Sequence, residues 1–121
     1  MEILIIGAGR MARGLVHDFL KNTAIQRIHI VDQSKDQLNQ LTSHFNSDRL
    51  QTHISAADDA TTLKPLIARV DGLVSAVPYD YNVTLSEWAI EGGTHMVDLG
   101  GNNDIVARQR ALNAAAQQAG V

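Results

Sequence analysis

The sequence predicts an α/β fold: a doubly wound parallel sheet with strand order 3-2-1-4-5, in three layers (helices, sheet, helices). Short apolar runs alternate five times with helical patterns, which is the pattern of right-handed strand–helix–strand units. Four of these runs are nearly continuous in aliphatic residues, as expected of strands covered on both faces. The third alternates apolar with polar residues, which favours the edge position. The predicted strands are residues 2–6, 27–31, 50–55, 72–77 and 94–99.

Helical patterns fill the intervals between these strands. The first covers residues 10–21, and the second begins at Ser34, with Gln37 at capping-box spacing. The third helix has apolar residues at helical spacing, and Pro65 is expected near its first turn. The fourth, residues 82–91, ends at a Gly-Gly pair, and the fifth, residues 104–119, ends at Gly120. The chain therefore reads as one domain, residues 1–121, without linkers or repeats.

Composition narrows the possible functions. The chain has 121 residues, 10 basic and 13 acidic, with a net charge of −3 and no basic block, which argues against nucleic-acid and membrane-surface binding. It has no cysteine, which excludes disulfides and thiolate chemistry, and its five histidines lack metal-ligand spacing. No segment has the length of a membrane span or the pattern of a signal peptide. A cytoplasmic location and no metal are the expectations.

The first strand runs directly into a glycine turn. Gly7 permits the tight turn, Gly9 allows the backbone to approach a diphosphate, and Ala12 lets the following helix pack closely on the strand. Arg10 and Met11 lie between them, in the first helical turn, whose free N–H groups and positive dipole favour an anion. This context predicts a Rossmann-type domain that binds NAD or NADP at residues 7–12.

Asp32 ends the second strand, twenty residues after Ala12. A carboxylate at this position accepts hydrogen bonds from the adenosine ribose hydroxyls and repels a 2′-phosphate. NAD is therefore favoured, while the nearby cation of Lys35 leaves NADP possible. The alternative is a solvated acidic residue at a strand end.

The carboxyl ends of strands four and five lie on the same rim as the glycine turn. Ala76, Val77 and Pro78 are expected to border the pyrophosphate and the nicotinamide ribose, because ligands of doubly wound sheets bind at this switch point. Gly100, in a polar loop after strand five, is expected near the nicotinamide. The alternatives are a structural turn at Pro78 and an ordinary loop in which Asn103 caps the fifth helix.

No residue pattern in this chain predicts a catalytic acid, base or nucleophile. There is no Gly-x-Ser-x-Gly motif, and Tyr79 and Tyr81 lack a lysine four residues later. We therefore expect no catalytic residue here. In enzymes of this architecture the chemistry beyond cofactor binding commonly comes from a second domain.

Three segments resemble the saccharopine dehydrogenase-like family, and in particular its lysine 6-dehydrogenase-like members. They are Val-Ser-Ala-Val-Pro-Tyr (74–79), Trp-Ala-Ile-Glu-Gly-Gly-Thr-His (88–95) and Val-Asp-Leu-Gly-Gly-Asn (97–102). The resemblance implies a longer, dimeric oxidoreductase whose second domain binds a small-molecule substrate. It implies oxidation or formation of C–N bonds of lysine-derived amino acids with NAD or NADP. It places the cofactor glycines at Gly7 and Gly9 and the ribose acid at Asp32; Ala12 stands where many relatives have a third glycine.

A regulatory module is the alternative from another class. Rossmann domains of this length sense nucleotides in potassium channels and transporters and share the glycine turn and the strand-two acid, but not the loops at 74–79 and 97–102. A methyltransferase fits less well, because its glycine loop usually differs. Val121 follows the helix-ending Gly120 where a sixth strand is expected, so we expect the chain to be the N-terminal part of a longer two-domain enzyme.

Overall fold

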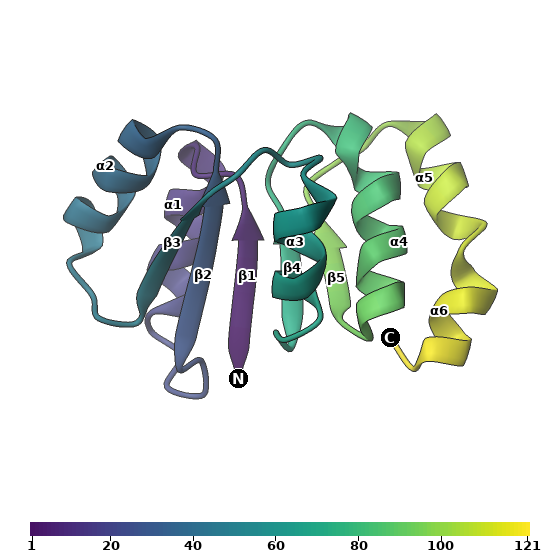
Figure 1. Ribbon diagram of the computed structural model, residues 1–121, viewed down its shortest axis with the longest axis horizontal. Helices are drawn as coiled ribbons and strands as arrows, with labels where there is room; N and C mark the ends of the chain where they lie inside the picture. The colour runs from purple at the N-terminus through teal and green to yellow at the C-terminus, as the bar shows by residue number, and fades with distance from the viewer.

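The computed structural model describes residues 1–121 as a five-stranded parallel sheet between two layers of helices (Figure 1). The strands are β1 (Glu2–Ile6), β2 (Arg27–Asp32), β3 (Leu50–Ile54), β4 (Gly72–Ser75) and β5 (His95–Asp98). Their order is β3-β2-β1-β4-β5, and all four neighbouring pairs are parallel. The predicted fold class and strand order are confirmed, and the alternating third strand lies at an edge.

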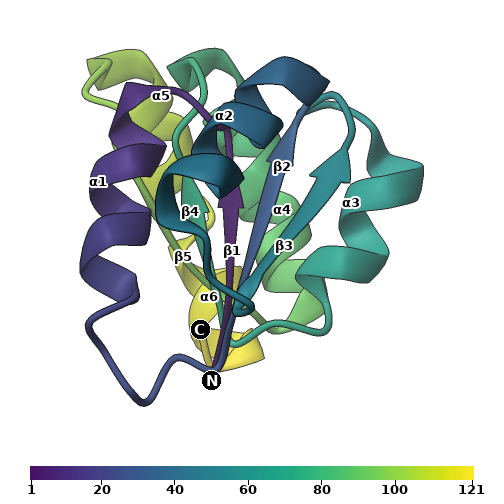
Figure 2. The ribbon, with the colours of Figure 1, turned by 90° about the vertical axis from the view of Figure 1, so that its left-hand side faces the viewer.

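The helices divide between the two faces of the sheet. They are α1 (Arg10–Phe19), α2 (Lys35–Phe45), α3 (Ala60–Ile67), α4 (Asn82–Gly92), α5 (Asn103–Arg110) and α6 (Asn113–Ala119), with a 3₁₀ turn η1 (Tyr79–Tyr81) before α4. Figure 2 shows α1 and α3 on opposite sides of the sheet. Each side has its own apolar core. One core joins Leu4 and Leu73 to α3 and α4, and the other joins Ile5 and Ile30 to α1 and α2.

Several helix ends follow the sequence signals. The Ser34 hydroxyl accepts the Gln37 N–H (3.3 Å) at the start of α2, and α4 ends at Gly93 with φ +68°. The cap of α5 is Asn102 rather than Asn103, because the Asn102 side chain accepts the N–H groups of Asp104 and Ile105. Such caps satisfy backbone groups that the helix itself leaves without partners.

Two helix predictions are wrong. The predicted fifth helix, residues 104–119, is two helices, α5 and α6, separated at Ala111 and Leu112. No glycine or proline marks the break, and Leu112 at the break lines a groove together with residues of α4. Pro65 is the sixth residue of α3, not part of its first turn, and the helix ends two residues later. Asp59 fixes the start of α3 by accepting the N–H groups of Thr61 and Thr62.

The prediction that β5 is covered on both faces is also wrong. Met96 packs against the α3–α4 core, but Val97, its neighbour along the strand, has 63% of its surface exposed. The core on the α1–α2 side is built over β1 and β2, so this face of β5 has no helix above it. β3 and β4 end one and two residues earlier than predicted, and β5 is one residue shorter than predicted at each end.

Candidate functional site

The carboxyl ends of β1, β2, β3 and β4 enclose a cleft of about 430 Å³. This is the end of a parallel sheet where ligands of doubly wound folds bind. Six residues predicted for cofactor binding line it together: Gly7, Gly9, Asp32, Ala76, Val77 and Pro78. The structure therefore brings the glycine turn, the end of β2 and the segment after β4 to one place.

Four other predicted site residues do not line this cleft. Arg10 and Met11 are exposed in the first turn of α1, and Met11 is 61% exposed. Ala12 is fully buried in the core between α1 and the sheet, where it allows close packing of that helix. Gly100 lies farther along the rim, against Asn82 and Asp98.

Glycine is needed at positions 7 and 9 for different reasons. Gly7 has φ +105°, and a Cβ there would lie 2.7 Å from the Ala76 carbonyl oxygen, so the fold itself requires glycine. Gly9 has an ordinary φ of −76°, and no protein atom lies within 4 Å of the place a Cβ would occupy. Its N–H has no acceptor within the protein. Folding alone thus gives no reason for glycine at position 9, whereas a ligand approaching the backbone does.

Asp32 ends β2 beside the glycine turn, and both of its carboxylate oxygens accept backbone N–H groups. Oδ2 accepts the N–H of Ala8 at 2.8 Å, and Oδ1 accepts the N–H of Ser34 at 2.7 Å. An ionised carboxylate offers about four acceptor positions, so about two remain for other donors.

The charge of the cleft is acidic. Asp32 and Asp58 are the only charged residues that line it, and no lysine or arginine does. Lys35, which the sequence suggested as a partner for a phosphate, is exposed on α2 outside the lining. Two carboxylates and no cation disfavour an additional phosphate group in this cleft.

Sequence reasoning missed part of the lining. Gln33, Gln37, Tyr81 and the segment 55–57 border the cleft. The segment 55–57 follows β3, and in a parallel sheet the end of every strand reaches the same rim. That rule was a usable signal for residues 55–57, whereas Gln37 and Tyr81 approach only through the packing of α2 and η1.

Asn82, another residue that sequence reasoning missed, anchors the rim beside β5. The Ser75 hydroxyl donates to Asn82 Oδ1 at 2.7 Å, and both residues are 1% exposed. The Asn82 amide nitrogen lies 2.8 Å from where a Gly100 Cβ would stand. The space beside Gly100 is thus occupied by protein.

The comparisons with known proteins agree with this architecture. The family model described as the saccharopine dehydrogenase NADP binding domain matches residues 3–121. The chain belongs to this family. It is an NAD(P)-binding domain of the oxidoreductase type, as the resemblance in the sequence implied.

Solved structures share the fold of this saccharopine dehydrogenase-type domain at low identity. The saccharopine dehydrogenase (L-Glu forming) of Saccharomyces cerevisiae matches with a TM-score of 0.75 and 19% identity, over 92% of this chain and 23% of that one. Biliverdin reductase of Synechocystis sp. PCC 6803, in complex with biliverdin and NADP⁺, gives 0.78 and 18%, over 98% and 35%. The WlbA dehydrogenase of Bordetella pertussis, in complex with NADH and UDP-GlcNAcA, gives 0.72 and 17%, over 100% and 33%. The domain thus spans about a quarter to a third of these chains.

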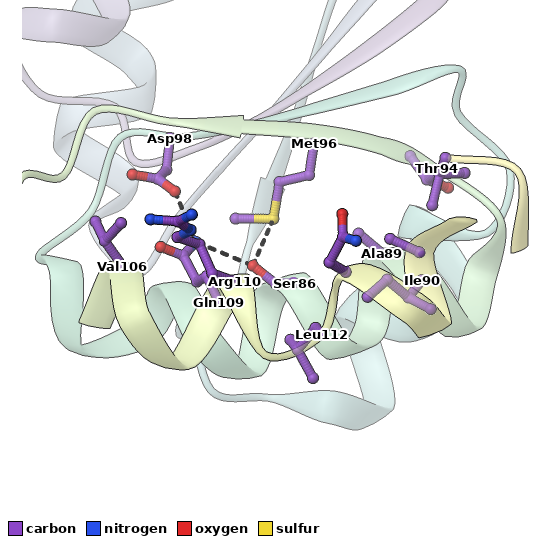
Figure 3. Close-up of a pocket in the computed structure, with 13 residues that line it drawn as sticks. Ser86, Ala89, Ile90, Thr94, Met96, Asp98, Val106, Gln109, Arg110 and Leu112 are labelled. Carbon is purple, nitrogen blue, oxygen red and sulfur yellow. Dashed lines mark hydrogen bonds between the residues drawn. The ribbon is translucent and has the colours of Figure 1, made fainter. Parts of the chain in front are cut away.

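A second, larger groove of about 640 Å³ lies between β5, α4, α5 and α6 of the NAD(P)-binding domain (Figure 3). Its polar groups bind one another. Gln109 Nε2 donates to Asp98 Oδ2 at 2.8 Å and to the Ser86 hydroxyl at 3.1 Å, as the dashed lines in the figure show. The groove contains no glycine turn, so its size alone does not make it the dinucleotide site.

A chain of three titratable side chains links β1, β2 and β3 outside the cleft. Buried His29 is 2.9 Å from Glu2 Oε2 through Nε2 and 3.0 Å from His53 Nε2 through Nδ1. The hydrogen bond to His29 lowers the pKa of Glu2, and partial burial, followed by the charges of His29 and Arg69, lowers the pKa of His53. No group of three or more His, Cys, Asp or Glu side chains in the domain is arranged so that it could hold a metal ion. None of the helices has the length and apolar character to cross a membrane.

Proposed function

We propose that this domain binds NAD in the cleft beside the glycine turn. The pyrophosphate lies over Gly9 at the N-terminus of α1, the adenosine ribose faces Asp32, and the nicotinamide half extends toward Ala76, Val77 and Pro78. The observation that carries the proposal is the open space and unpartnered N–H at Gly9, within a cleft that ends at a helix N-terminus. When bound, the cofactor supplies hydride transfer, and the domain supplies its orientation.

The acidic lining supports NAD over NADP. A 2′-phosphate facing Asp32 would meet like charge, and the cleft offers no lysine or arginine to neutralise it. The family description names NADP, so this preference separates the present domain from the description of its family. Arg10 and Lys35 remain outside the lining of the cleft.

A matched pair of glycine variants tests the cofactor site. Gly9→Ala and Gly14→Ala each add one methyl group on α1 or at its start, and neither meets a protein atom within 4 Å. We expect Gly9→Ala to weaken NAD binding at least tenfold, because the methyl group occupies the approach of the pyrophosphate. Gly14→Ala, which lies outside the cleft, should bind NAD as the wild type does. Calorimetric titration with NAD and NADP measures both effects.

Equal affinity of the wild type and Gly9→Ala for NAD, in folded proteins, contradicts the site. If the wild type binds NADP more tightly than NAD, the proposed cofactor preference is wrong. Lys35 then becomes the candidate that binds the 2′-phosphate.

We further propose that the protein acts as the cofactor-binding part of an NAD-dependent oxidoreductase working on the C–N bond of a lysine-derived amino acid. Its family and the loops at 74–79 and 97–102 support this substrate class. The solved structures that share the fold hold different substrates, such as UDP-GlcNAcA and biliverdin. The fold alone therefore does not identify the substrate of this protein. The catalytic groups, the substrate contacts and the dimer interface are assigned to a second domain. The cleft residues identified above supply no acid–base pair of their own.

A further inference from the structure

Asp32 is joined to the glycine turn as well as facing the cleft. The first two N–H groups of the turn both go to β2: Gly7 donates to the Val31 carbonyl oxygen at 2.7 Å, and Ala8 donates to Asp32 Oδ2 at 2.8 Å. The next N–H, that of Gly9, is the first one left without an acceptor in the protein. The end of β2 therefore accepts the first two N–H groups of the turn, and the N–H of Gly9 stays free to bind a ligand.

The second carboxylate oxygen holds the start of the next helix. Asp32 Oδ1 accepts the N–H of Ser34, the residue that caps α2. One side chain thus bridges the entry of α1 and the entry of α2. Hydrogen bonds to a charged acceptor are stronger than those to a neutral one.

We propose that Asp32 is a positioning residue for the pyrophosphate: it holds the glycine turn in the conformation that presents the Gly9 N–H to the cleft, in addition to receiving the ribose. This inference rests on the proposed NAD site. The two roles are compatible, because the two bound amides use about half of the acceptor positions of a carboxylate.

The positioning role and simple electrostatics predict opposite outcomes. A carboxylate beside a diphosphate repels it, so removing the charge alone should strengthen the binding of an anion. If Asp32 also orders the turn, removing it should weaken binding of an anion that has no ribose at all. Inorganic pyrophosphate is such a probe.

The experiment uses Asp32→Ser and Asp32→Asn, with Asp59→Ser as the matched control. Asp59 also accepts two backbone N–H groups, those of Thr61 and Thr62, but it does so at the start of α3 and does not line the cleft. Two NMR measurements are made on each protein. One is hydrogen exchange of the Ala8 amide without ligand, and the other is titration of the Gly9 amide signal with inorganic pyrophosphate.

We expect Ala8 exchange to accelerate at least tenfold in Asp32→Ser, less in Asp32→Asn, and not in Asp59→Ser. Pyrophosphate binding should weaken at least threefold in Asp32→Ser and stay at the wild-type value in Asp59→Ser. The asparagine variant guards against loss of folding, because it keeps the shape of the side chain and one acceptor oxygen.

Unchanged Ala8 exchange in Asp32→Ser, or pyrophosphate binding that strengthens as the charge is removed, overturns the positioning role. Failure of the wild type to bind NAD overturns the proposed site instead, while the exchange measurement still decides whether Asp32 holds the turn.

Discussion

At the scale of single residues, the glycines of the rim fall into two kinds. Gly7 and Gly100 have protein atoms where a Cβ would stand, whereas Gly9 and Gly101 have none within 4 Å. The first kind is required by the fold. The second kind leaves space that a ligand can use. The sequence placed Gly100 near the nicotinamide, as a glycine of the second kind, and the structure shows that it is of the first kind.

Gly100→Ala should destabilise the fold, and Gly101→Val should not. A Cβ at position 100 would lie 2.8 Å from Asn82 Nδ2 and 3.0 Å from Asp98 Oδ1, and Asn82 is buried and bonded to Ser75. Moving these groups costs about 1–3 kcal/mol, the usual penalty for overpacking. Urea unfolding of the two variants measures the difference. If both unfold with the wild-type midpoint, the contacts of Gly100 are not tight in solution.

At the scale of elements, the three strands β1, β2 and β3 are tied together by side chains as well as by their backbones. Glu2, His29 and His53 form one line of hydrogen bonds from β1 to β3. Arg27 lies 3.8 Å from Glu2, and the charge of Arg69 acts on both Glu2 and His53. A change in the protonation of these side chains therefore changes the hydrogen bonds that tie the three strands together.

The stability of the domain should fall in two steps as the pH decreases. Because partial burial lowers the pKa of folded His53 below its usual 6.5, the unfolded chain takes up this proton first. The unfolding free energy therefore decreases as the pH falls below about 7. The lowered pKa of Glu2, caused first by its hydrogen bond to His29, adds a second decrease below about pH 5.

Urea unfolding at a series of pH values tests this, with His53→Gln as the variant and His95→Gln, at an exposed histidine, as the control. The His53 variant should lose the upper step, and the control should keep it. If the unfolding free energy changes with pH in the same way in all three proteins, His53 is not the cause of the upper step.

At the scale of the whole molecule, the cleft lies among the carboxyl ends of β1 to β4. The glycine turn, Asp32 and the segments after β3 and β4 line it, while the loop after β5, farther along the rim, is exposed. The helices α5 and α6 lie at the opposite end of the molecule from α2 (Figure 1). This shape is suited to holding a cofactor against a substrate carried by another domain.

The 121-residue chain should bind NAD weakly and show no turnover. Incubation with NAD and lysine or saccharopine should produce no NADH absorbance, whereas the longest natural form of the protein should produce it with one of these substrates. Turnover by the 121-residue chain would mean that the chain itself contains a catalytic acid or base, with Tyr79, Tyr81 and His95 as the first candidates. NAD binding without turnover by any natural form would favour the regulatory module.

The sequence by itself determined the fold class, the strand order, the helix ends at Ser34, Gly93 and Gly120, and the strand–turn–helix at residues 7–12. These features follow from apolar periodicity and from backbone conformation, which neighbouring residues set. The same spacing rules selected ten candidate residues, and six of them meet in the cleft, because parallel strands bring their carboxyl ends to one rim.

Only the tertiary structure decided what these residues touch. Asp32 holds an amide 24 residues away, Asn82 occupies the space beside Gly100, and Val97 is exposed although its neighbours in sequence suggested burial. The break between α5 and α6 likewise has no local signal. Such contacts depend on strand register and on which helix covers which strand. These are properties of the assembled layers, so no stretch of sequence contains them.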